Sequence, residues 1–153
     1  MKKVAFIFPG QGSQTIGMGK DFFENNDIAK EMISKASARL DVDFEKLLFE
    51  ENENLGKTEF TQPAILLVSS IANAIFKEKC NIIPEFVLGH SLGEFSALVA
   101  AGAINYLDAI ELVHRRGLFM TEACSGGGAG MMALVGIDDA TVEKICEEQR
   151  DAG

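Results

Sequence analysis

The feature that most constrains this chain is the hexapeptide Gly89-His90-Ser91-Leu92-Gly93-Glu94, which lies between a short apolar run and an amphipathic run. A Gly-x-Ser-x-Gly sequence between a strand and a helix forms a sharp turn, the nucleophile elbow. Its two glycines leave room where side chains would collide with the turn. The sequence therefore predicts a strand before residue 89, a helix from Leu92, and Ser91 projecting between them.

The position of Ser91 also indicates a chemistry. Its hydroxyl would lie at the N-terminus of a helix, where unpaired N–H groups such as that of Leu92 favour developing negative charge. This arrangement is half of an acyl-transfer site. Gly-x-Ser-x-Gly is common by chance, so a glycine-flanked turn without catalytic function is the alternative interpretation.

Three apolar runs predict strands, at residues 4–8, 86–88 and 131–137. The first is continuous and aromatic-rich, which is typical of a strand buried on both faces of a parallel sheet. Helical periodicity fills the segments between them, so the fold class is α/β. A buried parallel sheet usually has about four to six strands; we therefore expect this chain to be the front part of a larger protein.

The helices are predicted from apolar spacing and capping residues. Thr61 is the expected N-cap of a long core helix, with Pro63 in the first turn, where its missing N–H costs nothing. Asn105 is the expected N-cap of a later helix. The other predicted helices cover residues 27–40, 44–49, 92–101 and 140–149.

The segment Gly10-Gln11-Gly12-Ser13-Gln14 follows the first predicted strand. A dinucleotide-binding fingerprint is excluded because Thr15 stands at its third glycine position. Two interpretations remain open: a loop whose glycines let backbone N–H groups approach a ligand, or a tight turn without one.

Composition limits the partners and the location. The net charge is −9 and the isoelectric point is near 4.7, which argues against nucleic acid or an anionic membrane as a partner. The three cysteines have no metal-ligand or disulfide spacing. The apolar run at residues 4–8 is too short for a secretory signal, and no stretch approaches the roughly 18 apolar residues of a membrane span, so we expect a cytoplasmic protein.

A serine nucleophile needs a base, and the chain has two histidines. His90 adjoins Ser91, where successive side chains diverge, so it is expected to pack behind the elbow. His114 is expected to be structural or exposed, which leaves the base outside this chain. Arg116 lies at the edge of a buried helical stripe, where it either reaches into a cleft or extends into solvent.

Four segments together resemble the N-terminal half of the malonyl-CoA:acyl carrier protein transacylase family, which is related to the acyltransferase domains of polyketide synthases. They are Phe8-Pro9-Gly10-Gln11-Gly12-Ser13-Gln14, the hexapeptide with Ser96-Ala97-Leu98, Arg116-Gly117 with Met120, and Gly128-Ala129-Gly130-Met131-Met132-Ala133. The resemblance extends over essentially all 153 residues, and the order and spacing of the segments make it specific.

The resemblance implies that Ser91 forms a malonyl ester, that backbone N–H groups of Gln11 and Leu92 form the oxyanion hole, and that Arg116 binds the malonyl carboxylate. Gly89, His90 and Gly93 would support the elbow.

The implied fold is a partial α/β-hydrolase-like core over residues 1–125, with the start of a ferredoxin-like subdomain over residues 126–153. Malonyl-CoA would be the substrate and acyl carrier protein the partner, with no bound cofactor or metal. Family members carry their catalytic histidine in the missing C-terminal half. The alternatives are an inactive fragment that needs that half, a polyketide-type acyltransferase, and a serine hydrolase with the same elbow.

Overall fold

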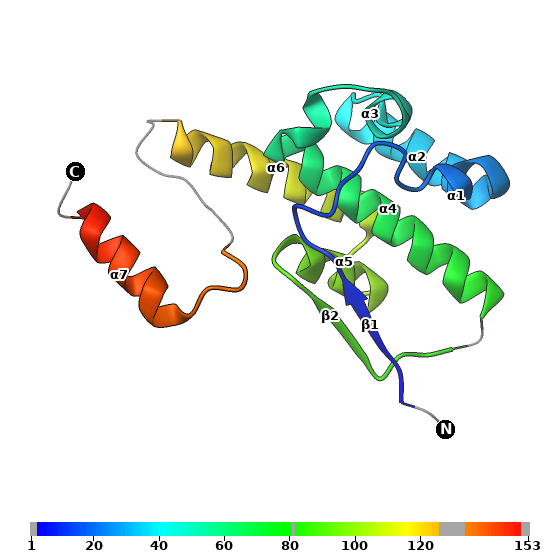
Figure 1. The fold of residues 1–153 in the computed structure, drawn as a ribbon. Helices are drawn as coiled ribbons and strands as arrows, with labels where there is room; N and C mark the ends of the chain where they lie inside the picture. Colours follow the sequence, from blue (N-terminus) through cyan, green and yellow to red (C-terminus); the bar gives the residue numbers. More distant parts are fainter. Residues whose placement is uncertain (1–2, 81, 126–133, 151–153) are drawn as a thin grey trace. The chain divides into compact units, whose positions relative to one another are not determined.

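Two parallel strands and a set of helices make up the computed structural model, which describes residues 3–80, 82–125 and 134–150 (Figure 1). Its internal contacts divide the chain into two compact units, Met1–Ala123 and Cys124–Gly153. The described elements of the first unit are β1 (Ala5–Phe8), α1 (Lys20–Asn25), α2 (Asp27–Leu40), α3 (Phe44–Phe49), a 3₁₀ turn (Asn54–Gly56), α4 (Thr58–Lys79), β2 (Phe86–Gly89), α5 (Leu92–Ala100) and α6 (Tyr106–Cys124), whose last residue falls in the second unit. The second unit contains α7 (Asp139–Arg150).

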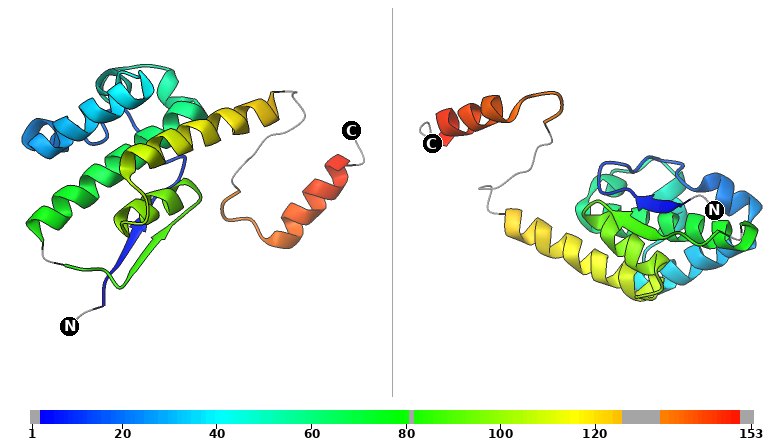
Figure 2. Two further views of the ribbon diagram at one scale, coloured as in Figure 1. Left: turned by 180° about the vertical axis from the view of Figure 1, so that it is seen from behind. Right: turned by 90° about the horizontal axis from the view of Figure 1, so that it is seen from below.

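Helix α4 is the centre of the first unit. It contacts α2 and α3 on one side and α5 on another, and its apolar side chains form much of the core. Figures 1 and 2 show α4 running between the α1–α3 layer and the strands. By length and composition α4 is also apolar enough to cross a membrane, but 61% of its most apolar 18-residue window is buried inside the fold. Its apolar character is therefore accounted for by burial in the core.

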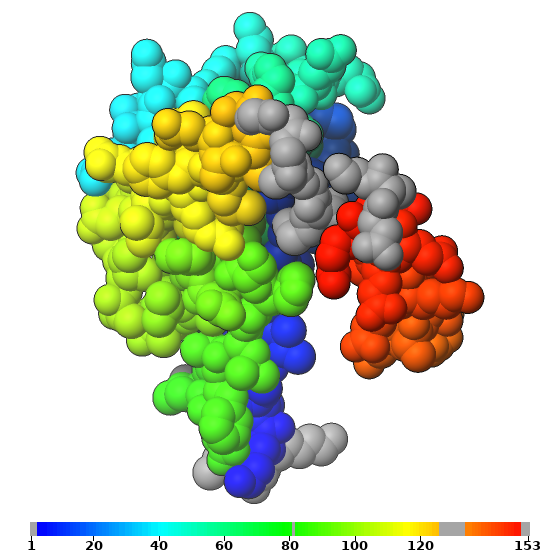
Figure 3. Space-filling view, turned by 90° about the vertical axis from the view of Figure 1, so that its left-hand side faces the viewer, coloured from blue at the N-terminus to red at the C-terminus, as the bar shows by residue number. Residues whose placement is uncertain are grey.

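Strands β1 and β2 pair in parallel, with Ala5 opposite Phe86 and Phe8 opposite Gly89. Phe8 packs on α5, and the Phe6 ring meets Phe76 of α4 edge to face. The prediction that β1 is buried on both faces is wrong, because Ile7 is 75% exposed. In the described residues the sheet has two strands, and its helices cover one face. Figure 3 shows the strand surfaces, green and blue, at the lower end of this unit.

The predicted helices are confirmed, with one shifted start. Helix α4 begins at Thr58, one turn before the expected N-cap. The Thr61 hydroxyl lies inside the helix, where it donates to the carbonyl oxygens of Leu55 and Lys57. Asn105 does cap α6, since its side chain accepts from the Leu107 N–H at 2.9 Å.

The third predicted strand, at residues 131–137, lies partly outside the described residues. Its described part, residues 134–137, is not a strand, and Gly136 has a φ of +77°. The described sheet contains only β1 and β2, so this segment has no strand partner in the part of the chain that the structure describes, and an unpaired strand leaves its N–H and C=O groups without partners. The run Ser125-Gly126-Gly127-Gly128, whose composition predicts a linker, also lies mostly outside the described residues.

Candidate active site

Ser91 sits on a strained turn between β2 and α5. Its φ of 51° and ψ of −104° are rare for a residue with a side chain, which marks the strain expected of a nucleophile elbow. A methyl group at Gly89 would overlap the main chain of Gly93, and one at Gly93 would overlap the carbonyl oxygen of Phe8. Both glycines are therefore required for the turn to pack on β1. Ser91 itself is exposed.

The loop after β1 lies beside this turn. Because Phe8 pairs with Gly89 in a parallel sheet, both loops leave the sheet at the same edge. A Cβ on Gly10 would lie 2.6 Å from the carbonyl oxygen of His90 and 2.9 Å from its ring Nδ1. The exposed His90 ring therefore lies against Gly10, and residues 10–14 adjoin the elbow.

Two backbone N–H groups are available at this edge. Leu92 opens α5, so its N–H has no partner within the helix. Within the described part of the chain, neither this N–H nor that of Gln11 has a hydrogen-bond acceptor. The Gln11 side chain donates to Thr58 Oγ1 at 3.1 Å, which ties the loop to the start of α4.

Arg116 of α6 reaches the elbow. Its Nη2 donates to Ser91 Oγ at 3.1 Å, and its guanidinium lies 5.8 Å from the centre of the Phe95 ring, within cation–π range. Of the two interpretations of Arg116, the side chain that reaches into the site is the one observed. The hydroxyl of Ser91 accepts this bond, which leaves its own proton free to be donated.

Comparison with known proteins agrees with this geometry. A family model described as the acyl transferase domain matches residues 5–151. The chain belongs to the acyl transferase domain family.

Relatives of this chain carry a narrower name, malonyl CoA-acyl carrier protein transacylase. The chain is 45% identical over 148 residues to the protein of that name from Staphylococcus aureus, and the match covers 96% of this chain and 47% of the relative. The enzyme of the same name from Salmonella typhimurium is 45% identical over 152 residues, covering 99% and 49%. The chain thus spans about half the length of the curated relatives it matches.

Solved structures of acyl transferases share the fold. The malonyl-CoA:acyl carrier protein transacylase of Helicobacter pylori superposes with a TM-score of 0.90 at 46% identity, covering 97% of this chain and 48% of that one. A malonyl-transacylase solved in complex with a type II polyketide synthase acyl carrier protein superposes with a TM-score of 0.83 at 36% identity, covering 96% and 48%. The mixed, mostly helical α/β fold is therefore that of the matched half of these proteins.

One residue of the candidate site was missed by sequence reasoning. Gln62 is completely buried on α4, and its Oε1 accepts from Arg116 Nη1 at 2.6 Å. The signal that could have found it is a glutamine inside an otherwise apolar helical stripe, because a buried amide needs a hydrogen-bond partner.

The second histidine of the chain, His114, makes a structural contact: its Nδ1 lies 2.8 Å from the carbonyl oxygen of Glu59.

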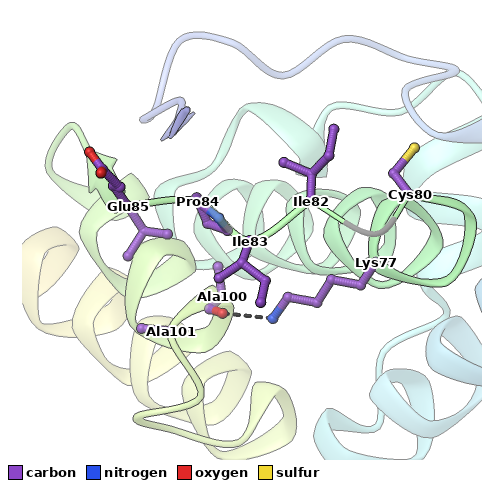
Figure 4. Close-up of a pocket in the computed structure, with 9 residues that line it drawn as sticks. Lys77, Cys80, Ile82, Ile83, Pro84, Glu85, Ala100 and Ala101 are labelled. Carbon is purple, nitrogen blue, oxygen red and sulfur yellow. Dashed lines mark hydrogen bonds between the residues drawn. The ribbon is translucent and has the colours of Figure 1, made fainter. Parts of the chain in front are cut away.

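A pocket of about 480 Å³ lies elsewhere in the acyl transferase chain, between the end of α4, the segment before β2 and the end of α5 (Figure 4). Lys77 crosses it to donate to the carbonyl oxygen of Ala100 at 2.7 Å. None of the predicted site residues lines it. It opens at the amino-terminal end of β2, whereas ligands of parallel sheets bind at the carboxyl ends of the strands. The candidate active site is therefore the exposed elbow.

Proposed function

We propose that the whole protein containing this chain transfers a malonyl group from malonyl-CoA to the phosphopantetheine thiol of acyl carrier protein. The observation that carries the proposal is the 3.1 Å contact between Arg116 Nη2 and Ser91 Oγ, which puts a guanidinium beside the nucleophile. A planar guanidinium binds a carboxylate in bidentate fashion. A malonyl group on Ser91 would find this partner, whereas an acetyl group would leave the charge without one.

The transfer would take two steps through an ester. Ser91 Oγ attacks the thioester carbonyl carbon while a base takes the hydroxyl proton; the C–S bond then breaks and CoA leaves as its thiol with that proton. In the second step the carrier-protein thiol attacks the ester, its proton returns to Ser91 Oγ through the base, and the malonyl thioester leaves. The N–H groups of Gln11 and Leu92 would stabilise the oxyanion of each tetrahedral intermediate.

The base would come from the part of the protein outside this chain. His114 is engaged with the Glu59 carbonyl oxygen, and His90 adjoins Ser91, where consecutive side chains diverge. We therefore expect the 153-residue chain to need the remaining half of the protein for turnover.

The finer description of the fold belongs to the same proposal. Residues 1–125 would form the N-terminal part of an α/β-hydrolase-like core, which the parallel strand pair and the elbow support. Residues 126–153 would begin an inserted ferredoxin-like subdomain.

Mass spectrometry of the intact protein tests the ester. The whole protein incubated with malonyl-CoA should gain the mass of one malonyl group, and Ser91→Ala should gain none. Ser34→Ala, which removes an exposed hydroxyl on α2, is the matched control and should be labelled like the wild type. Labelling of Ser91→Ala at the wild-type level would sink the proposal.

A polyketide-type acyltransferase is the second candidate, because one similar structure is a complex with a type II polyketide synthase carrier protein. The two candidates share the ester and differ in the carrier that accepts the malonyl group. Loading assays with a fatty-acid carrier and a polyketide carrier, compared at equal concentration, would separate them.

A further inference from the structure

Gln62 presents both ends of its side-chain amide to α6. Its Oε1 accepts from Arg116 Nη1 at 2.6 Å, and its Nε2 lies 3.3 Å from Met120 Sδ. Arginine carries only donors, so the carbonyl end of the amide must be the end that faces the guanidinium. The orientation of this completely buried amide is therefore fixed by chemistry.

The backbones of the two helices also meet closely at this point. A Cβ on Gly117 would lie 2.5 Å from Glu59 Cα, so α6 passes directly over the first turn of α4. This close packing fixes the main chain of Arg116, which precedes Gly117, against the start of α4. Its contacts with Ser91 and Phe95 involve an exposed and a half-buried residue, whereas the contact with Gln62 is to a side chain fully shielded from water.

A glutamine suits this place better than a glutamate. Its carbonyl accepts a hydrogen bond from Arg116 and leaves the positive charge of the guanidinium uncompensated. A carboxylate there would pair with that charge and compete with any carboxylate of a substrate. Each terminal nitrogen of arginine carries two donors, so Nη1 keeps one donor after bonding Gln62.

We propose that Gln62 is a positioning residue that sets the preference for acyl groups with a free carboxylate, by holding Arg116 so that its remaining donors face the acyl group on Ser91. This inference rests on the proposed function, since it concerns the selectivity of the same site. Gln62 does not touch the reacting atoms and acts through Arg116.

The test measures kcat and KM of the whole protein with malonyl-CoA and with acetyl-CoA. Gln62→Met keeps the length of the side chain and removes the acceptor. It should lower the malonyl-to-acetyl ratio of kcat/KM about tenfold or more, the size expected for losing a hydrogen bond to a charged group. The decrease in kcat/KM should occur for malonyl-CoA, and kcat/KM for acetyl-CoA should change less than about threefold.

Gln62→Glu keeps the shape and the acceptor and adds a negative charge. It should also lower the malonyl-to-acetyl ratio, mainly through a raised KM for malonyl-CoA, because the carboxylate neutralises Arg116. Thr61→Val is the matched control. This neighbour on α4 is equally buried, and its hydroxyl bonds only carbonyl oxygens of its own segment, so the variant should lose stability without a change in the ratio.

The outcomes separate this inference from the proposed function. If the wild type forms a malonyl ester on Ser91 and Gln62→Met keeps the wild-type ratio, or loses both activities equally, the positioning role is overturned. If Gln62→Met does not fold, Gln62→Glu decides, since an unchanged ratio there overturns the role as well. If the wild type forms no ester, the proposed function itself fails.

Discussion

Pro63 leaves a gap in the hydrogen bonding of α4 that His114 fills. Proline has no N–H, so the carbonyl oxygen of Glu59, four residues earlier, has no helical partner. His114 Nδ1 lies 2.8 Å from this oxygen, and because a carbonyl only accepts, Nδ1 is the protonated nitrogen. The His114 ring also lies against Phe60. One histidine thereby fastens α6 to α4 beside Gln62.

Replacing this histidine should cost stability through one hydrogen bond. His114→Phe keeps an aromatic ring and removes the donor, which should lower the free energy of unfolding by about 0.5–1.5 kcal/mol, the typical contribution of one hydrogen bond, here to a partly buried carbonyl oxygen. Urea denaturation of the 153-residue chain measures it.

The control is a double-mutant cycle with Pro63→Ala, which returns a main-chain N–H to the Glu59 carbonyl oxygen. His114→Phe should cost less in that background. If the two changes add within about 0.5 kcal/mol, the histidine acts through something other than this carbonyl.

At the residue scale, local sequence determined what could be predicted. The elbow at Ser91 follows from glycine spacing over five residues, because Gly89 relieves a conflict within the turn and Gly93 one with the adjoining strand β1. The partners of Gln62 and His114 lie more than 50 positions away, and they follow from how α4 and α6 cross. The residue spacing within each helix does not predict how the two helices cross.

At the element scale, the helices with an apolar stripe or a capping residue were predicted well. Helix α1 was not predicted, because it has six residues, none of them buried, and so no apolar period to detect. The start of α4 was misplaced because Pro63 suggested a first turn. A proline is tolerated beyond the first turn of a helix when another group donates to the carbonyl oxygen that lacks its helical partner, as His114 does here for Glu59.

A charged cluster links α2 to α6. Arg39 donates to Asp108 Oδ1 at 3.0 Å and to Glu111 Oε2 at 2.9 Å, and Arg115 pairs with Glu111 at 2.7 Å. The hydrogen bond from Arg39, followed by the charge of Arg115, lowers the pKa of the Glu111 carboxyl below its ordinary value. The folded state therefore favours the carboxylate form.

This shift predicts a pH-dependent contribution to stability. Because the pKa is lower in the folded state, the contribution is present above the unfolded pKa of a glutamate and is lost as the pH falls through the folded one. Glu111→Gln should therefore lower the Tm at neutral pH and converge with the wild type in acid. Thermal denaturation followed by circular dichroism at several pH values measures this.

Glu31→Gln is the comparison, because among the described residues Glu31 forms its ion pair with Lys35 of its own helix, α2. It should change the Tm less than Glu111→Gln at neutral pH. A Tm difference between Glu111→Gln and the wild type that persists unchanged into acid would contradict the role given to the Arg39 cluster.

At the scale of the whole molecule, one face of the strand pair is open in the described structure. Ile7, Phe86 and Leu88 are 75%, 63% and 52% exposed, and the strand register places Ile7 beside Leu88. The apolar runs correctly predicted parallel strands but could not show what covers their second face. That depends on segments outside the strands themselves, and exposed apolar patches of this kind mark contact surfaces.

The open face should make the 153-residue chain associate with itself or bind a hydrophobic dye. Ile7→Thr with Leu88→Thr places a polar, β-branched residue that suits a strand at both positions, so dye binding and concentration-dependent association should fall. Val135→Thr removes an apolar side chain that is 90% exposed in the other unit, and serves as the control. Size exclusion over a range of concentrations and dye fluorescence measure both effects. A wild type that stays monomeric and binds no dye would contradict the expectation that this face is a contact surface.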